Sequence, residues 1–422
     1  MKKEQVVKLV VIGSLICSSV IPFSGYAIFL SFLFYELVKG ELKDLICLLV
    51  KEKLVLSLFF MGVFSLIVSD YKMDSLLGVG VIFVLIFMYL VIRKYLYSIN
   101  DTMDIYKYFV ISNIIISIYG IIQFYFGKDV FFASGWIDSE VYSITMRAYS
   151  SLLNPNVLAG YLVFCSCLQL TSLENITYRR INIISLVLSS FCLILTYSRG
   201  AWLTLLIIAF LVFLYRKKVI YIIYSFIFFI SLLLINGSTG IERINLGKSL
   251  HDHSIQYRLE IYKATLKSIK DHFFFGSGLN TMKYYINYYS NEIDSPVYHA
   301  HNIILNILGE TGFIGLIFFG IILLGIIKSI YYIYKSQNNM YKDIAISSIL
   351  SLISIFIHGF IDAAIIAPQF SFFVVIIYSL IINIRHNSFL EEKIGKPCST
   401  NINNSGGELY GTRDTGIKKS NF

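Results

Sequence analysis

The sequence predicts an all-α protein, a polytopic transmembrane helical bundle of about 12 spans with one long, partly helical outer loop. Of 422 residues, 56% are hydrophobic and only 14% are charged, whereas a soluble globular protein carries about 25% charged residues. There are only 5 prolines, so most apolar runs can form unbroken helices. Many of these runs approach the roughly 20 residues that a helix needs to cross a bilayer.

Apolar runs between charged or turn-forming segments define the expected spans. They lie at 7–21, 25–38, 54–69, 76–92, 105–126, 157–172, 181–197, 200–215, 218–235, 313–334, 343–361 and 370–384. The first run resembles a signal peptide but continues into a second apolar stretch without a small-residue cleavage site, so we expect an uncleaved span. Residues 1–384 thus form the bundle. The Ser-, Asn-, Gly- and Lys-rich segment 385–422 is expected to be a disordered cytoplasmic tail.

Lysine and arginine give an independent test of orientation. With the N-terminus inside, 24 of the 35 basic residues fall in cytoplasmic segments, and the short outer segments keep only four: Lys72, Lys128, Arg147 and Arg199. Basic residues favour cytoplasmic loops, so we expect a cytoplasmic (inner) membrane protein with both termini in the cytoplasm. The same bias explains the net charge of +9, and nucleic acid is not expected as a partner.

Two outer segments, 127–156 and 236–300, are too long to be simple turns. Within the second, apolar residues recur at helical spacing and predict an amphipathic helix over 255–270, with a stripe formed by Ile255, Leu259, Tyr262, Leu266 and Ile269. The run from His301 to Tyr334 would be about 51 Å long as one helix. Because Gly309, Gly312 and Gly315 offer a break, we predict a separate short helix over 301–311 and a span from about Phe313.

Ionisable residues near the outer membrane face are the functional candidates, because charge at membrane depth is costly unless it serves a purpose. Each has an ordinary alternative: an interfacial anchor for Arg199, a solvated face for Arg258, a helix cap for His301 and Asn302, and a bundle-closing pair for His358 and Asp362. Their convergence on one face favours function. The candidates, with supporting residues, are Arg147, Arg199, Arg258, His301, Asn302, Glu310, His358 and Asp362.

Metal and cofactor motifs are absent from the sequence. It has no P-loop, no GxGxxG fingerprint, no HExxH and no Asp-x-Asp. His251-Asp252-His253 offers possible ligands, but adjacent side chains point in different directions. None of the six cysteines lies in an expected outer loop, so no disulfide is expected. We therefore predict no metal and no cofactor.

Several motifs in order resemble the O-antigen ligase and O-antigen polymerase superfamily of bacterial membrane glycosyltransferases. They are Asn154-Pro155-Asn156 with Leu158-Ala159, Ser198-Arg199-Gly200, the loop helix Arg258 to Asp271 with Gly276-Ser277-Gly278, His301-Asn302 through Gly312 and Gly315, and the pair His358 and Asp362. The resemblance spans residues 150–370. Phe273-Phe274 stands where the family often has Pro, and Tyr262 where Trp is common, and both changes affect packing more than chemistry.

The resemblance implies transfer of a glycan from a polyprenyl-diphosphate carrier such as undecaprenyl diphosphate to an acceptor hydroxyl on a glycan or lipid. Arg199 and Arg258 would bind the diphosphate in place of a metal, because guanidinium groups suit phosphate. His301 would accept the proton of the acceptor, and Glu310 would orient it or share that role. Partners would be the donor, the acceptor, membrane lipids and envelope-assembly proteins.

Other classes of function remain open at this stage. A transporter or lipid-linked-glycan flippase would place polar residues at mid-bilayer depth in two related halves, whereas here they gather at one face without a repeat. A non-catalytic assembly partner is a third reading. Within the superfamily, the motifs do not separate a polymerase from a ligase, because the acceptor makes that difference.

Overall fold

Every regular element in the described part of the chain is helical. The computed structural model describes residues 2–127, 146–171, 178–244, 253–290, 293, 297–336 and 339–394, and these contain no β-strand. Trp136 and the tail beyond Ile394 lie outside the described residues, as do the side chains of the His251-Asp252-His253 group.

The helices follow the apolar runs of the sequence. They are α1 (Lys3–Ser18), α2 (Ser24–Lys39), α3 (Leu42–Lys51), α4 (Lys53–Val68), α5 (Lys72–Tyr95), α6 (Ile99–Phe126), α8 (Pro155–Thr171), α9 (Arg179–Leu195), α10 (Arg199–Arg216), α11 (Ile220–Ile244), α13 (His253–Asp271), α14 (Met282–Tyr289), α15 (Ile303–Tyr334), α16 (Asn339–Gly359) and α17 (Pro368–Ile394). Short 3-10 turns at Ser150–Leu152 and Ala364–Ile366 precede α8 and α17.

The chain is a multi-pass membrane protein. Six of the described helices are long and apolar enough to cross a bilayer: α5, α6, α10, α15, α16 and α17. Four shorter apolar stretches lie at Ser24–Val38, Lys53–Val68, Pro155–Leu170 and Ile220–Ile235. Each of the twelve predicted spans coincides with a helix, but the number of crossings, about twelve, stays a prediction.

Two predicted boundaries differ from the structure. Helix α11 continues to Ile244, past the predicted start of the long loop at 236. Helix α17 continues to Ile394, past the predicted start of the tail at 385. There Arg385 donates a hydrogen bond to Ser329 and lies over the ring of Tyr332. These contacts with α15 give the polar end of α17 partners that its own sequence does not reveal.

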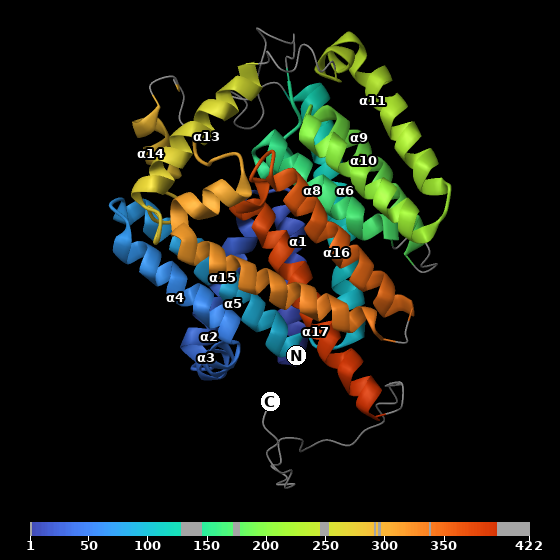
Figure 1. The fold of residues 1–422 in the computed structure, drawn as a ribbon. Coiled ribbons are helices and arrows are strands. Elements are labelled where there is room, and N and C mark those ends of the chain that lie inside the picture. Colours follow the sequence, from blue (N-terminus) through green and yellow to red (C-terminus); the bar gives the residue numbers. More distant parts are fainter. Residues whose placement is uncertain are drawn as a thin grey trace.

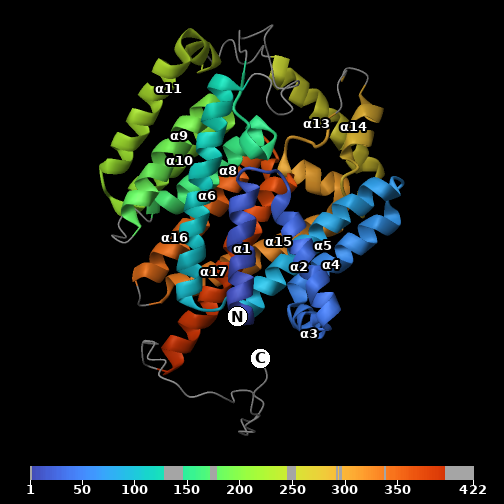
Figure 2. The same cartoon turned by 180° about the vertical axis from the view of Figure 1, so that it is seen from behind.

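The long helices pack around α8, α16 and α17, with α8 against α16 and α5 against α17 (Figure 1). Seen from behind, α1 lies between α2 and α6 (Figure 2). Helix α11 packs against α9 and α10 at one edge, and α13 and α14 cover one end of the bundle. The start of α1 and the end of α17 lie at the opposite end.

The predicted break in α15 is confirmed. Gly312 has φ 68° and ψ −170°, so the helix is interrupted there. The interruption frees backbone groups, and the loop after α13 satisfies them. The Phe313 and Ile314 amides donate to the carbonyls of Phe273 and Phe274, and the Ser277 and Gly278 amides donate to those of Gly309 and Glu310. A Cβ on Gly312 would lie 2.4 Å from the Phe274 oxygen, which explains why glycine stands here.

The predicted amphipathic helix is confirmed as α13, but only part of the predicted stripe is buried, because Ile269 is 6% exposed whereas Leu259 and Leu266 face outward. Leu259 and Leu266 are 50% and 48% exposed, whereas Ile261 and Ala264 are buried against Met282 of α14 and its neighbours. A spacing of three and four residues establishes a helix, but it does not show which side the partner covers. Apolar residues lie on two adjoining faces of α13, and α14 packs against the face that carries Ile261 and Ala264.

Candidate functional site

Asp362 is the centre of the polar cluster at the end of the bundle covered by α13. It lies in the turn after α16, and its side chain is 3% exposed. Its Oδ2 accepts a hydrogen bond from Asn156 Nδ2 at 2.7 Å and lies 3.1 Å from His301 Nδ1. Arg258 Nη2 lies 3.8 Å from the same oxygen. The start of α8, the loop before α15 and α13 thus bring three polar side chains to one buried carboxylate.

The four-residue spacing of His358 and Asp362 predicts that they share one helix face, and this prediction is wrong. Helix α16 ends at Gly359, so Asp362 lies beyond it, and its amide donates to the His358 carbonyl at 2.7 Å. Both residues instead hold Asn156: His358 Nε2 lies 3.1 Å from its carbonyl oxygen. Gly160 makes room for the imidazole, because a Cβ there would lie 2.7 Å from the ring.

Arg147 acts on Asn156 from the other side. Its Nη2 donates to Asn156 Oδ1 at 2.9 Å, and its Nε donates to the Thr196 carbonyl at 2.8 Å. The Asn156 amide group therefore accepts from Arg147 and donates to Asp362. This arrangement fits the supporting role predicted for Arg147. Asn156, which the sequence analysis named only as part of a motif, therefore links Arg147 to Asp362.

His301 and Asn302 directly precede α15. Asn302 is the N-cap, and its Oδ1 accepts from the amides of Ile304 and Leu305. Its Nδ2 donates to the Phe360 carbonyl at 3.2 Å, which ties the start of α15 to the Asp362 turn. His301 has a positive φ of 49°, and Tyr262 of α13 donates to its carbonyl. A capped helix end thus directs the half-buried His301 imidazole at Asp362.

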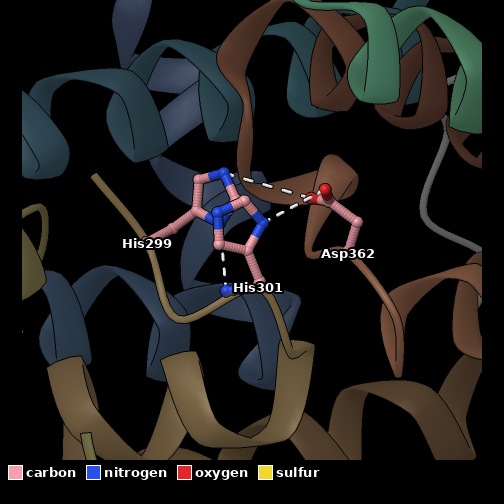
Figure 3. A group of neighbouring side chains, drawn as sticks. All are labelled: His299, His301 and Asp362. Carbon is pink, nitrogen blue, oxygen red and sulfur yellow. Dashed lines mark hydrogen bonds and ion pairs between the residues drawn. The ribbon is translucent and has the colours of Figure 1, made fainter. Parts of the chain in front are cut away.

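His299 is a site residue that sequence reasoning missed. Its Nδ1 accepts the His301 amide at 3.2 Å, and its Nε2 lies 4.0 Å from Asp362 Oδ1 (Figure 3). Burial, and then the neighbouring His301, lowers the pKa of His299 to about 4, so the ring is neutral at pH 7. The signal for it was the spacing of His299 two residues before His301, and the two ring centroids lie 4.3 Å apart.

Asp362 is ionised at neutral pH. Burial opposes ionisation, but His301, His299 and Arg258 more than offset that cost, so the pKa of Asp362 lies well below its usual value. A carboxylate held in this way can fix the orientation and tautomer of a neighbouring imidazole. With the proton on His301 Nδ1 and directed at Asp362, the Nε2 lone pair is available as a base.

The atoms of His299, His301 and Asp362 lie within 4.8 Å of one another, which would allow them to hold a metal ion. The hydrogen bonds favour another use. Because His299 Nδ1 accepts a backbone amide, its neutral ring carries the proton on Nε2, which faces Asp362. A ring in this tautomer donates and does not ligate. The donor set therefore fits two imidazoles that face one carboxylate better than a metal centre.

Glu310 was predicted to orient His301 or share its role as base, but the contacts place it elsewhere. It is buried, and it interacts with the Asn306 side chain and the backbone of Asn280 and Met282. Asn306 in turn accepts from the amide of Ala300 at 2.9 Å. Glu310 therefore reaches the histidine loop through Asn306 and Ala300.

Arg199 begins α10, directly after the N-cap Ser198. Its neighbour Gly200 packs against Ile361, where an added Cβ would lie 2.8 Å from the Ile361 side chain. The start of α10 is therefore adjacent to the Asp362 turn. That Arg199 and Arg258 bind the same group stays a prediction.

Comparison with known families agrees with the resemblance seen in the motifs. Residues 184–320 match the sequence model of the family described as O-antigen ligase. The matched segment contains Arg199, Arg258, His299 and His301 and extends through the break in α15, whereas Asn156 and Asp362 lie outside it. No curated protein matches the chain. The match supports the O-antigen ligase and polymerase superfamily.

Proposed function

With the O-antigen ligase match as the premise, we propose that this membrane protein is a glycosyltransferase that uses a polyprenyl-diphosphate-linked glycan. It moves the glycan to an acceptor hydroxyl at the outer face of the cytoplasmic membrane, as a polymerase or ligase of a surface polysaccharide. The observation that carries the proposal is the contact of His301 Nδ1 with the buried Asp362 carboxylate, with Arg258 beside both.

His301 is the general base in this proposal. Asp362 accepts a hydrogen bond from the protonated Nδ1 of His301. Nε2 of the same ring removes the proton of the acceptor hydroxyl as the hydroxyl oxygen attacks the anomeric carbon. The bond from this carbon to the diphosphate oxygen breaks, and the polyprenyl diphosphate leaves with the electron pair. One direct displacement inverts the anomeric centre. A positioned base contributes about 10²–10⁴ to such a rate.

Arg258 stabilises the leaving diphosphate. Its side chain is 23% exposed, and its 3.8 Å separation from Asp362 is longer than a direct hydrogen bond, so the guanidinium can still engage a second anion. Arginine offers a permanent charge and a planar fork that matches phosphate. Arg199, at the adjacent start of α10, is proposed as the second diphosphate ligand. Two such cations supply the charge stabilisation for which other enzymes use a divalent metal.

Supporting residues hold this arrangement. Asn156, with Arg147 and His358 around it, fixes Asp362, and Asn302 fixes the start of α15. The contacts of Glu310 favour a positioning role over a direct part in proton transfer. His299 Nε2 lies 4.0 Å from the second oxygen of Asp362, and His299 is proposed to keep that carboxylate aligned with His301.

Two substitutions test the proposal in cells: His301→Ala and Arg199→Lys. Both should lower surface glycan and raise the lipid-linked precursor at normal protein levels, and single-repeat products would identify a polymerase. The matched controls are His272→Ala, away from Asp362, and Arg216→Lys at the opposite end of α10. A normal amount of surface glycan in both site variants would show that the proposed mechanism is wrong. Purified protein that releases polyprenyl diphosphate from the donor would exclude a transporter or flippase.

The proposed orientation places the Asp362 end of the bundle outside and both termini in the cytoplasm. The start of α1 and the end of α17 lie at the same end of the bundle, away from α13 (Figure 1). Cysteine labelling from outside the cell should modify Tyr288→Cys, at an exposed position of α14, and should not modify Lys217→Cys.

A further inference from the structure

Helix α14 packs on the turn between α4 and α5, at the same end of the bundle as Asp362 (Figure 1). Asp74, in the first turn of α5, accepts hydrogen bonds from the Lys283 ammonium group and from the Tyr284 hydroxyl. The ring of Tyr284 stacks on that of Tyr71, with the two centroids 3.8 Å apart. A charged pair and two aromatic rings thus form one surface, although Asp74 and Lys283 are 209 residues apart in the chain.

Two more tyrosines extend this surface. Tyr288 follows Tyr284 by one helical turn, so both lie on the same face of α14, and Tyr288 is 78% exposed. Tyr298 is 65% exposed. Asp74, and then Tyr284 and Tyr298, raise the pKa of Lys283, so the Tyr298 hydroxyl lies near that ammonium group. The name tyrosine patch is used here for Tyr71, Tyr284, Tyr288 and Tyr298 with the Lys283–Asp74 pair.

The tyrosine patch adjoins the Asp362 site. Val297 is buried in the apolar cluster between α13 and α14, and two residues later the His299 imidazole faces Asp362. Tyr298 stands between Val297 and His299, so the patch begins one residue away from the histidine loop. A molecule that extends from the Asp362 site toward α14 therefore meets exposed tyrosine rings.

The chemistry of the tyrosine patch suits a sugar chain. The C–H faces of sugar rings stack on aromatic rings, while sugar hydroxyls need hydrogen-bond partners. Tyrosine supplies a large, rigid, amphipathic contact at low entropic cost, and the partly exposed Lys283–Asp74 pair offers donors and acceptors. A hydrocarbon chain would remove water from this charged pair without replacing its hydrogen bonds. Asp74 also offsets the charge of Lys283, which disfavours a phosphate as the occupant.

We propose that the tyrosine patch binds an oligosaccharide segment of the glycan substrate, several sugars beyond the one that reacts. The sugar rings stack on Tyr288 and Tyr298, and their hydroxyls bond to Lys283 and Asp74. This inference rests on the proposed function, because it assigns a further part of a substrate of the Asp362 site.

The first measurement is binding without transfer. Full-length protein in nanodiscs is titrated in a calorimeter with oligosaccharides of several repeats, prepared by partial acid hydrolysis of surface polysaccharide from cells that express the protein. The variants are Tyr288→Ala and Tyr298→Ala, with Tyr288→Phe to keep the ring. The matched control is Tyr125→Ala, at a position near the end of α6 that is 55% exposed. Thermal unfolding confirms that each protein is folded.

We expect Tyr288→Ala and Tyr298→Ala to bind the oligosaccharide at least fivefold more weakly than the wild type. Tyr288→Phe and Tyr125→Ala should bind within twofold of it, because the first keeps the stacking face and the second lies outside the tyrosine patch. Absence of binding by the wild type, or equal binding by all the variants, would overturn the proposal. The tyrosines would then be anchors at the level where the membrane meets water.

The second measurement separates this inference from the proposed function. Release of polyprenyl diphosphate is followed with donors that carry one repeat or several repeats. In Tyr288→Ala, the KM for the longer donor should rise at least fivefold relative to that for the shorter donor if the patch holds the donor glycan. An unchanged ratio with weaker oligosaccharide binding would assign the patch to the acceptor glycan.

The two ideas fail in different ways. If the wild type releases no carrier from either donor, the proposed function is wrong, and the binding measurement still decides whether the patch holds a glycan. If the wild type releases the carrier but Tyr288→Ala and Tyr298→Ala bind the oligosaccharide as well as it does, the proposed function stands and the inference about the patch is wrong.

Discussion

Replacing Asp362 with asparagine changes one atom at the centre of the site. In the structure, Oδ2 faces Asn156 Nδ2 and His301 Nδ1, and Oδ1 faces His299 Nε2. An asparagine has one NH₂ group and one oxygen. If its NH₂ faces His299, two donors meet, and the neutral amide oxygen opposite His301 no longer stabilises the imidazolium that forms when the base takes a proton. If its NH₂ faces His301, the imidazole must move its proton to Nε2 and can no longer act as a base.

The magnitude follows from these two orientations. Loss of a positioned general base lowers the rate about 10²–10⁴-fold, which corresponds to about 3–5 kcal/mol of activation free energy. An unsatisfied buried donor lowers the free energy of unfolding by about 1–3 kcal/mol. We therefore expect Asp362→Asn to fold with reduced stability and to lose at least a hundredfold in kcat/KM.

The assay measures release of polyprenyl diphosphate from a lipid-linked glycan by purified protein in nanodiscs. Asp104→Asn is the matched control, because Asp104 pairs with Lys8 near the start of α6 and is 50% exposed. The control should retain wild-type kcat/KM. A folded Asp362→Asn protein with kcat/KM within fivefold of the wild type would show that Asp362 does not set the state of His301, and the proposed mechanism would be wrong.

Three further predictions concern the cation, the second histidine and the break in α15. Arg258→Lys should lower kcat/KM about tenfold or more while thermal stability is unchanged, because lysine keeps the charge but loses the planar fork; equal activity would argue against diphosphate binding. The pKa of His299 is about 4 in the folded protein and about 6.5 in the unfolded chain, so between these values the unfolded state binds more protons. The free energy of unfolding therefore falls as pH drops from 6.5 to 4. The thermal midpoint of His299→Gln should fall less over this range, and identical pH curves for the variant and the wild type would contradict the prediction. Gly312→Ala should cost at least 1–2 kcal/mol for its positive φ and more for the clash with Phe274, measured as a lower thermal midpoint, whereas Gly320→Ala on the same helix meets nothing within 4 Å and should be neutral or stabilising.

The sequence determined the helices and the break between two of them. Apolar runs are local, and in lipid a backbone must satisfy its own hydrogen bonds, so each run becomes a helix wherever it packs. The interruption at Gly312 could be predicted for a related reason, since closely spaced glycines weaken a helix that is too long for one span. The amphipathic character of α13 was also visible, because it depends only on spacing.

The tertiary structure decided which faces are buried and which residues meet. Leu259 and Leu266 are exposed because α14 covers the other side of α13, and no local pattern specifies that choice. Glu310 was the nearer carboxylate to His301 in sequence, yet Asp362, 61 residues away, is its partner. Asn156 joins the same carboxylate from 206 residues away. Such contacts depend on how α8, α15 and α16 pack against one another, and hydrophobic periodicity fixes each helix without fixing its rotation or its neighbours.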